Sequence, residues 1–378
     1  MKKVARRMAL VAAGMAVPAG AQTLRYWDIG TQGSIVGGSG TWSTSNGNKT
    51  WNDIGGAQNT RGPWNNTTNA NDIAVFGTAA AGGALSTVTT GAAITAGGLR
   101  FDAVNYTIAG TAANAITLNA GTIAANVDAT ISAVLAGTTI TKSGAGLLTL
   151  SGANTYTGLT TISAGVLRAG SAAALGTTAG GTTVTTGAAL ELTGGISIGA
   201  EALTLNGTGL LSGGALRNIT GTNTYGGLIT LGSATRINSD VGTLTLSNAG
   251  TITGAGLGLT VGGAANTVIA SIIGTASGTV TKDGTGLLTL SGGNTYTGGT
   301  TVRGGILRLT GTGTLGAATN AVVVSADGSA TNGTTAVLDL NGVSATIGAL
   351  TMGGTSVAGL VSNLSLIHIS EPTRQAEI

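Results

Sequence analysis

Carboxylates are the side chains of this sequence best suited to chemistry, because cysteine is absent and His368 is the single histidine. Ser-His-Asp and Cys-His nucleophiles and histidine-based metal sites are therefore excluded from residues 22–364. What remains is a pair of carboxylates acting on a glycosidic bond, or a lyase that uses Ca²⁺ and an arginine. The acids available are Asp28, Asp53, Asp72, Asp102, Asp128, Glu191, Glu201, Asp240, Asp283, Asp327 and Asp339.

The spacing of these acids does not indicate a catalytic centre. They are scattered along the chain, and the nearest set that includes a base is Asp53, Arg61 and Asp72. The calcium-binding pattern G-G-x-G-x-D is not found, and the glycine-rich residues 311–316 lack the Lys-Ser or Lys-Thr of a phosphate loop. We therefore expect no catalytic, cofactor-binding or metal-binding residues, no cofactor, no enzyme activity, and no acid–base cluster outside residues 53–72.

The composition predicts an all-β protein. The 378 residues include 68 Gly and 3 Pro, and 42% are hydrophobic while 8% are charged. The apolar content excludes disorder, and the dominance of Gly and Thr excludes a helical bundle. The net charge of +3 comes from four basic residues before position 8, whereas residues 22–364 hold 11 basic and 11 acidic side chains. No nucleic-acid partner is expected from such a neutral body.

The two ends of the chain differ from this body. Residues 1–21 combine a basic start, a short apolar stretch and the sequence Ala19-Gly20-Ala21, which predicts a signal peptide and a mature chain that starts near Gln22. Residues 365–378 contain no Gly and include Pro372. The string LIHISEPTR within them is similar to a translated sequencing adapter. We expect a non-native tail that forms no further coil, the alternative being a genuine polar tail.

The body of the chain repeats itself. Residues 141–167 align without a gap with residues 281–307 at an offset of 140, and a looser copy lies near residues 223–231. The long period is therefore about 70 residues, which is typical of a solenoid. The polar residues that coincide in the two close copies are Lys142 and Lys282, Asn154 and Asn294, and Tyr156 and Tyr296.

Alternation within each copy predicts the strands. Apolar and polar residues alternate over 148–150 and 288–290, so we expect these leucines to face a core and Thr149 and Thr289 to face outward. Short strands at intervals of 8–12 residues suit a parallel, right-handed β-helix with coils of 20–24 residues, about 15 in all. A sandwich does not explain the close copies, and a propeller requires blades of about 40 residues.

The mature N-terminus, residues 22–80, is expected to cap the solenoid. All four tryptophans lie in this segment, and a solenoid needs a terminal cap whose outer face tolerates water. The alternative is an aromatic platform that stacks on sugars. The four residues are Trp27, Trp42, Trp51 and Trp64.

Several strings of residues resemble one known family. They are YWDIG from Tyr26, GTWSTSNGNKTWND from Gly40, GPWNNTTNANDIAVFG from Gly62, and the GLLTLSG and NTYTG blocks. Over about residues 26–320 the chain is similar to autotransporter passenger domains with passenger-associated β-strand repeats. The resemblance implies a repeat-bearing β-helix over residues 81–364. It also implies export, and translocation through a C-terminal outer-membrane barrel to the cell surface. Since no barrel pattern follows, we expect a passenger fragment.

The function expected from the sequence is that of a secreted, cell-surface rod that is adhesive or self-associating. Its expected partners are a host or abiotic surface, a polysaccharide, or like passenger chains. The alternative is a polysaccharide-active β-helix enzyme, either a lyase or a glycosidase. Ice binding is a third class, but the Thr-x-Thr pairs are unevenly spaced, and Thr suits exposed strand positions without any such role.

Overall fold

The computed structural model describes residues 22–27, 38–44, 51–53, 61–62, 64–77, 85–329, 332–333, 335–353, 359–362 and 367–369, and of residues 52–53, 61–62, 359–362 and 367–369 the backbone alone. The expected signal peptide lies outside the described residues. The chain forms two compact units, Met1–Thr160 with Ala173–Gly180, and Thr161–Ala172 with Gly181–Ile378.

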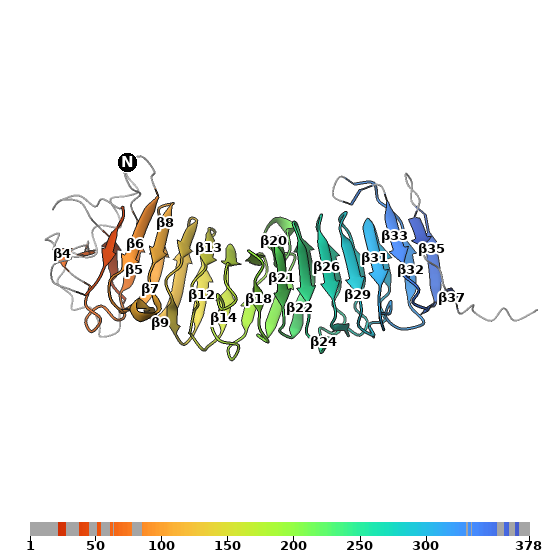
Figure 1. Cartoon of the computed structure of the whole chain (residues 1–378), viewed down its shortest axis with the longest axis horizontal. Helices are drawn as coiled ribbons and strands as arrows, with labels where there is room; N and C mark the ends of the chain where they lie inside the picture. Colours follow the sequence, from red (N-terminus) through yellow and green to blue (C-terminus); the bar gives the residue numbers. More distant parts are fainter. Residues whose placement is uncertain are drawn as a thin grey trace, which may run out of the picture. The chain divides into compact units, whose positions relative to one another are not determined.

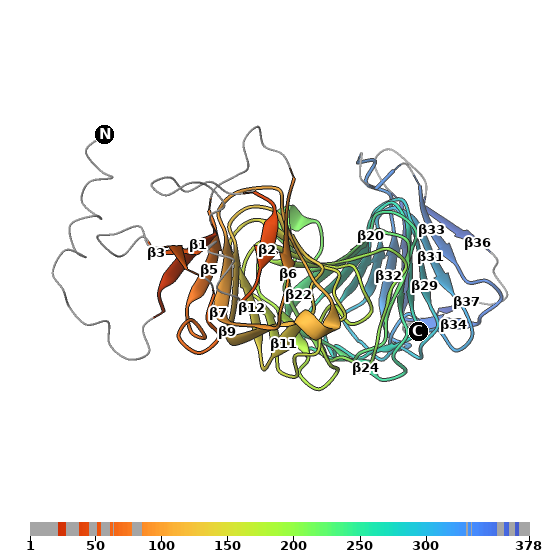
Figure 2. The same cartoon turned by 60° about the vertical axis from the view of Figure 1, so that its left-hand side comes forward.

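The first unit is built from two parallel ladders and a small antiparallel addition (Figure 2). One ladder contains β1 (Leu24–Trp27), β5 (Ile73–Phe76), β7 (Ile94–Phe101), β9 (Ile116–Ala125), β11 (Leu135–Gly137) and β12 (Ile140–Ser143). The other contains β2 (Gly40–Trp42), β6 (Ser86–Thr90), β8 (Tyr106–Ala109), β10 (Ala129–Ile131) and β13 (Leu147–Leu150). The antiparallel strands are β3 (Trp51–Asp53), which pairs with β1, and β4 (Arg61–Gly62).

The second unit contains longer parallel ladders, whose strands lie side by side in Figure 1. One group contains β15 (Val166–Ala169), β16 (Thr182–Val184), β17 (Ala189–Thr193), β19 (Leu203–Gly207), β20 (Leu216–Thr220), β22 (Ile229–Ser239), β25 (Leu259–Gly262), β28 (Val280–Lys282), β30 (Thr300–Val302), β32 (Ala321–Val324) and β35 (Ala349–Met352). A second group contains β18 (Ser197–Ile198), β21 (Thr222–Tyr225), β23 (Thr243–Leu246), β26 (Asn266–Ile269), β29 (Leu287–Leu290), β31 (Gly305–Leu309), β33 (Ala336–Asp339) and β36 (Gly359–Ser362).

The remaining elements are short. The strand β14 (Thr160–Ile162) spans the sequence boundary of the units, β24 (Thr251–Ile252) pairs with β27 (Ile272–Ile273), and β34 (Ala345–Ile347) pairs with β37 (Ile367–Ile369). Two single 3₁₀ turns occur, η2 (Ala112–Asn114) and η3 (Leu210–Ser212). Among the described residues no helix is long and apolar enough to cross a membrane.

The fold class predicted from the sequence is confirmed, since parallel strands stack as a β-solenoid. The length of a turn varies more than expected. Thr289 aligns with Arg308, 19 residues later, whereas Ile306 aligns with Val337, 31 residues later. The structure has about 11 turns rather than the expected 15, because long connections such as the one before Val337 lengthen individual turns.

The predicted orientation of the repeat leucines is confirmed. Leu148, Leu150, Leu288 and Leu290 are fully buried, while Thr149 and Thr289 are partly exposed. Successive side chains of a strand point to opposite faces, so the alternation of the sequence carries directly into an apolar interior and a polar exterior.

The four tryptophans lie in the interior of the first unit. Trp27, Trp42 and Trp64 are fully buried and Trp51 is 2% exposed. Their rings pack edge-on or tilted against one another, with neighbouring centroids 4.9–5.3 Å apart. A sugar cannot stack on buried rings, so the alternative of an aromatic sugar platform is wrong. The role of residues 22–80 as a cap stays a prediction.

One strand extends into the segment expected to be a non-native tail. Ile367–Ile369 forms β37 and aligns with Ala345–Ile347, His368 lying opposite Thr346. One strand of three residues is not a further coil, and backbone pairing requires no particular side chain, so the expectation that this segment forms no further coil stays a prediction. Residues 370–378 lie outside the described part of the chain.

Candidate functional site: a charged track on the second unit

The repeat lysines, which coincide in the two close copies, are internal. Lys282 is 2% exposed, and its Nζ donates to the carbonyl oxygens of Asp283 (2.6 Å), Gly284 (2.7 Å) and Gly304 (3.1 Å). Lys142 is fully buried and donates to Gly144 and Gly146. Burial lowers the pKa of both ammonium groups to about 8. These cations therefore stabilise turns and offer no surface charge.

The repeat asparagines join three successive turns. In the second unit, Asn294 Oδ1 accepts a hydrogen bond from Ile273 N (2.8 Å), and its Nδ2 donates to Thr314 O (2.7 Å). In the first unit, Asn154 makes the same pair of bonds with Leu135 N (2.9 Å) and Ala174 O (2.7 Å). The amide supplies one acceptor and one donor that the corner of a solenoid otherwise lacks.

The repeat tyrosines are also internal. The hydroxyl of Tyr156 lies 2.9 Å from Thr160 Oγ1, and that of Tyr296 lies 2.6 Å from Thr300 Oγ1. Gly316 lies against Tyr296 at a φ of +83°, where a side chain would be strained and would overlap the ring. The signature residues of the repeat thus hold the scaffold together, so a binding surface must be made by other residues.

Charged side chains of the second unit gather into one such surface, which we call the charged track. Arg168 donates to Glu191 Oε2 through Nε (2.9 Å) and Nη2 (2.6 Å). Arg217 donates to Glu191 Oε1 (3.3 Å) and to Asp240 Oδ2 (2.6 Å). The track consists of Arg168, Glu191, Arg217, Arg236, Asp240 and Asp283.

Strand register places the first three of these residues on consecutive turns. Arg168 on β15 aligns with Glu191 on β17, which aligns with Arg217 on β20. Neighbouring parallel strands lie about 4.8 Å apart, so side chains at aligned positions are within reach of each other. Opposite charges at these positions attract one another, whereas like charges would be destabilising.

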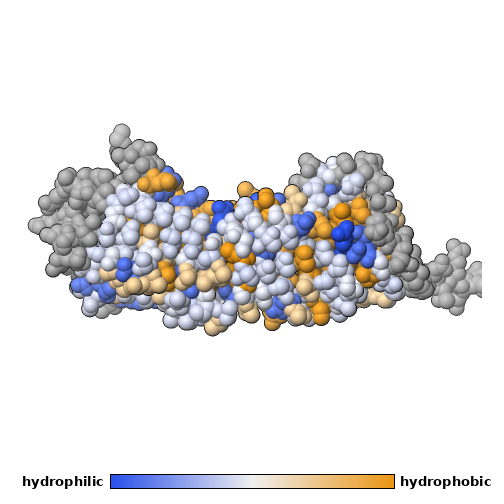
Figure 3. All heavy atoms as spheres, in the orientation of Figure 1, coloured by the Kyte–Doolittle hydropathy of each residue, from blue (hydrophilic) through white to orange (hydrophobic). Residues whose placement is uncertain are grey.

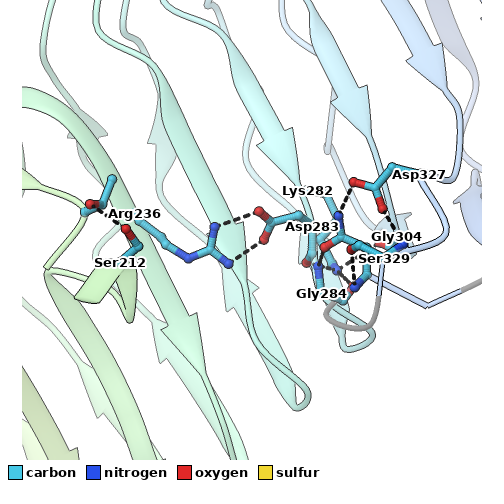
Figure 4. Close-up of polar contacts among 10 residues, drawn as sticks. Ser212, Arg236, Lys282, Asp283, Gly284, Gly304, Asp327 and Ser329 are labelled. Carbon is cyan, nitrogen blue, oxygen red and sulfur yellow. Dashed lines mark hydrogen bonds and ion pairs between the residues drawn. The ribbon is translucent and has the colours of Figure 1, made fainter. Parts of the chain in front are cut away.

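The pair formed by Arg236 and Asp283 spans a longer interval. The guanidinium donates to both carboxylate oxygens, at 2.6 and 2.7 Å, and Figure 4 shows the two groups facing each other. Gly262 on the intervening turn makes this reach possible, because a Cβ there would overlap Asp283 Oδ1 and Arg236 Nη2. A bidentate pair of this kind fixes both side chains.

A pocket of about 260 Å³ opens beside the charged track. The turn η3 contributes Leu210 and Leu211 to its lining, and Leu211 is 94% exposed at a φ of +50°. That backbone conformation is uncommon for a residue with a Cβ. The lining residues are Val166, Ala189, Glu191, Leu210, Leu211, Gly213, Gly214 and Arg217.

The expectation of no acid–base cluster outside residues 53–72 is wrong. Within that range, Asp72 pairs with Arg25 (2.9 Å), and the side chains of Asp53 and Arg61 lie outside the described residues. The acids look scattered because the residues that pair along the track, Arg168, Glu191, Arg217 and Asp240, lie 23, 26 and 23 residues apart. That spacing is one turn of the solenoid, which is the sequence signal that could have revealed the track.

The other acids do not join the charged track. Asp28 lies outside the described residues. Asp102 pairs with Arg100, Asp128 accepts a bond from Leu147 N, Glu201 from Thr182, Asp327 from Ser329 N, and Asp339 from Arg308. No group of three or more acidic or histidine side chains suited to a metal ion occurs in the part of the chain that the structure describes.

The geometry of the charged track suits recognition better than acid–base catalysis. Both oxygens of Glu191 accept hydrogen bonds from arginines, so neither is poised to take a proton from a substrate. Three side chains of the track remain accessible, with exposed fractions of 30% for Arg168, 37% for Arg217 and 27% for Asp240. These groups can contact a partner without losing their internal pairs.

Threonine ladders occupy corresponding outward positions elsewhere. In the first unit Thr107 aligns with Thr87 on one side and with Thr130 on the other, and Thr130 aligns with Thr149. All four are exposed or partly exposed. The prediction of outward threonine stripes is confirmed for this ladder, which offers hydroxyl groups and no charge.

Comparison with known proteins identifies the repeats. The family described as Passenger-associated-transport-repeat matches residues 140–169 and 280–309. Over 159 residues, which are 40% of this chain, the sequence is 40% identical to the protein named Adhesin BmaC autotransporter from Brucella suis biovar 1 (strain 1330). The aligned region spans 4% of that relative's length. No solved structure gives a significant match. The resemblance to autotransporter passengers is confirmed, and the β-solenoid fits such a domain.

Proposed function

We propose that this chain is part of an adhesive passenger that is exported and displayed at the bacterial cell surface, anchored at the outer membrane in the full-length protein. The proposal extends to this chain the adhesin role stated in the name of its relative. Contact with a surface, a polysaccharide or another passenger chain is the activity proposed. No catalytic step is part of it.

The observation that carries the proposal is that the polar residues of the interior and those of the exterior differ in what they bind. The polar residues shared by the repeats are buried and bridge neighbouring turns. Hydroxyl side chains line the exterior in the ladder of Thr87, Thr107, Thr130 and Thr149. On the face drawn in Figure 3, residues of intermediate hydropathy predominate and strongly hydrophilic ones are few. A surface with many hydrogen-bonding groups and little net charge can approach other neutral surfaces without electrostatic repulsion.

The enzyme alternative has one feature in its favour, the pocket beside Glu191 and Arg217. A glycosidase requires two carboxylates that flank a bond, one of them able to exchange a proton. Glu191 and Asp240 are each engaged by an arginine instead. The pairing supports a recognition role for this face over a catalytic one.

A bead assay tests the proposal directly. The purified chain is coupled to latex beads, and both bead clumping and attachment to glass, polysaccharide films and extracellular-matrix coatings are counted against albumin-coated beads. We expect clumping or attachment above the albumin control. Beads that do neither would overturn the proposal. Cleavage of a polysaccharide that disappears in Glu191→Gln would instead support the enzyme.

A further inference from the structure

We propose that Asn341 is a site of spontaneous covalent modification, at which the side-chain amide is lost and the residue becomes aspartate or isoaspartate in the folded chain. The reaction is intramolecular and goes beyond the proposed adhesive function. Three Asn-Gly dipeptides lie among the described residues, at positions 206, 332 and 341, and their surroundings differ. A fourth, Asn46-Gly47, lies outside the described residues.

An asparagine followed by glycine is chemically labile, because no Cβ hinders the glycine nitrogen as it approaches the asparagine side chain. At this site Gly342 N loses its proton and bonds to Cγ of Asn341, and the bond from Cγ to Nδ2 breaks. The leaving nitrogen takes up a proton and departs as ammonia, which leaves a five-membered succinimide ring. Water then opens the ring at either of its carbonyl groups. In all, one water is consumed and one ammonia is released.

The fold itself favours this dipeptide after β33. Asn341 and Gly342 have φ angles of +49° and +76°, and Val343 N donates a hydrogen bond to Leu340 O at 2.8 Å. Two positive φ angles closed by such a bond form a type I′ turn, for which Asn-Gly is strongly preferred. The two residues that make the turn possible are therefore also the two that can form the ring.

The turn leaves both reacting groups without hydrogen bonds. Asn341 and Gly342 are exposed, and neither the Asn341 side chain nor Gly342 N is bonded to any other group among the described residues. A Cβ added to Gly342 would meet no atom within 4 Å, so the turn can change shape without displacing a neighbour. Asn341 N donates to Asp339 Oδ1 at 3.0 Å, but this nitrogen is not part of the succinimide ring.

The dipeptide Asn332-Gly333 is held by hydrogen bonds at both reacting groups. Asn332 is 7% exposed, its Oδ1 accepts a hydrogen bond from Gly284 N (2.7 Å), and its Nδ2 donates to Asp327 Oδ2. Gly333 N donates to Ser329 O at 2.9 Å, so the attacking nitrogen is occupied. Figure 4 shows Gly284, Asp327 and Ser329 close together.

The dipeptide Asn206-Gly207 is held in a similar way. Asn206 Nδ2 donates to Val184 O (2.8 Å), and Gly207 N donates to Ser233 Oγ (2.7 Å). These bonds must break before the ring can close, and a local opening that breaks two or three hydrogen bonds makes the reactive state rarer by about tenfold or more. We therefore expect Asn341 to react about tenfold faster than Asn206 or Asn332 in the folded chain.

The modification would change the chain near a buried ion pair. Either product adds a negative charge two residues after Asp339, which is 4% exposed and pairs with Arg308 at 2.7 Å. Isoaspartate also lengthens the main chain by one carbon, because the chain then passes through Cβ of residue 341. The hydrogen bond between Val343 N and Leu340 O cannot keep its geometry in the longer turn. The connection from β33 to β34 is therefore expected to loosen.

The test compares the folded full chain with the same chain in guanidinium chloride. Both samples are aged at mildly alkaline pH, which promotes loss of the proton from the attacking nitrogen, in water enriched in heavy oxygen, which labels the new carboxylate. Pepsin digestion at acid pH stops the reaction, and tandem mass spectrometry measures aspartate and isoaspartate at each position. We expect similar rates at positions 206, 332 and 341 in the unfolded chain, and a rate about tenfold higher at 341 than at the other two in the folded chain.

The variant Asn341→Gly is the matched control, because a Gly-Gly pair suits the same turn and carries no amide. We expect no mass change in its peptide that contains position 341. Equal rates at the three positions of the folded chain, or a faster reaction at Asn206 or Asn332, would overturn the inference. So would an Asn341 that stays intact in the folded chain while it reacts in guanidinium chloride. The bead assay of adhesion is independent of all these outcomes.

Discussion

The close copies of the repeat and the looser copy between them all bury a tyrosine, but they differ in whether its hydroxyl has a hydrogen-bond partner. In the close copies the tyrosine hydroxyl bonds to a threonine four residues later. In the looser copy Ile229 occupies that position, and the fully buried hydroxyl of Tyr225 has no hydrogen-bond partner among the described residues. A buried polar group without a partner is costly, so the looser copy is less stable at this position than the close copies are.

A carboxylate accompanies this unpartnered hydroxyl. Glu201 is 2% exposed, and its Oε1 accepts a hydrogen bond from Thr182 Oγ1 at 2.5 Å. Burial raises the pKa of Glu201 to about 7, against the smaller opposing effect of that bond. Burial and the charge of Glu201 both raise the pKa of Tyr225. The comparison shows that the repeat tolerates the loss of the hydrogen-bond partner of its tyrosine. The asparagine of the looser copy, Asn223, still accepts a hydrogen bond from Ile196 N (2.7 Å).

The largest effect is expected from removing the buried asparagine that all copies of the repeat share. Asn294→Ala leaves Ile273 N and Thr314 O without partners in the interior. We expect the free energy of unfolding to fall by about 4 kcal/mol. Urea denaturation measures it, with Asn266→Ala as the control, because the Asn266 side chain is exposed and its Oδ1 accepts a long hydrogen bond of 3.4 Å from Leu287 N. Equal losses in the two variants would contradict the bridging role.

A smaller effect on stability is expected from pH, through the buried carboxylate of Glu201 beside the looser copy. The folded pKa of Glu201, about 7, lies above the ordinary value of 4.5. The folded state therefore holds this proton more tightly, and stability falls as pH rises from about 4.5 to 7, by roughly 3 kcal/mol. Denaturation midpoints across this range should lose that slope in Glu201→Gln, which stays neutral. An unchanged slope in the variant would assign the pH dependence to other groups.

The smallest effects on stability are expected from removing the tyrosine hydroxyls, and we expect them to have opposite signs in the close and the looser copies. Tyr296→Phe removes a hydroxyl that bonds to Thr300, so we expect a loss of about 1 kcal/mol. Tyr225→Phe removes a hydroxyl without a partner, so we expect a gain of about 1 kcal/mol. Thermal unfolding of the two variants provides the measurement. Destabilisation of the same size in both would mean that the looser copy satisfies its tyrosine as the close copies do.

The strands and their inward faces could be read from the sequence because they depend on local order. Alternation at residues 148–150 and 288–290 places Leu inward and Thr outward whatever the neighbouring turns contain. The offset of 140 between the copies predicted a solenoid for the same reason, since each turn repeats one local pattern. The resemblance to autotransporter passengers rested in part on these same blocks, and the family match covers residues 140–169 and 280–309.

Which side chains lie next to each other on neighbouring turns could not be predicted from local order, because this depends on the length of every connection between strands. The segment that contains the turn η3 lengthens the interval between Glu191 and Arg217 to 26 residues, yet the two residues remain aligned. Arg236 reaches Asp283 across 47 residues because Gly262 leaves room between them. Acids that look isolated in the sequence thus meet arginines on adjacent turns. The sequence by itself determined the solenoid and its inward leucines, and only the register of the folded turns decided where its charges gather.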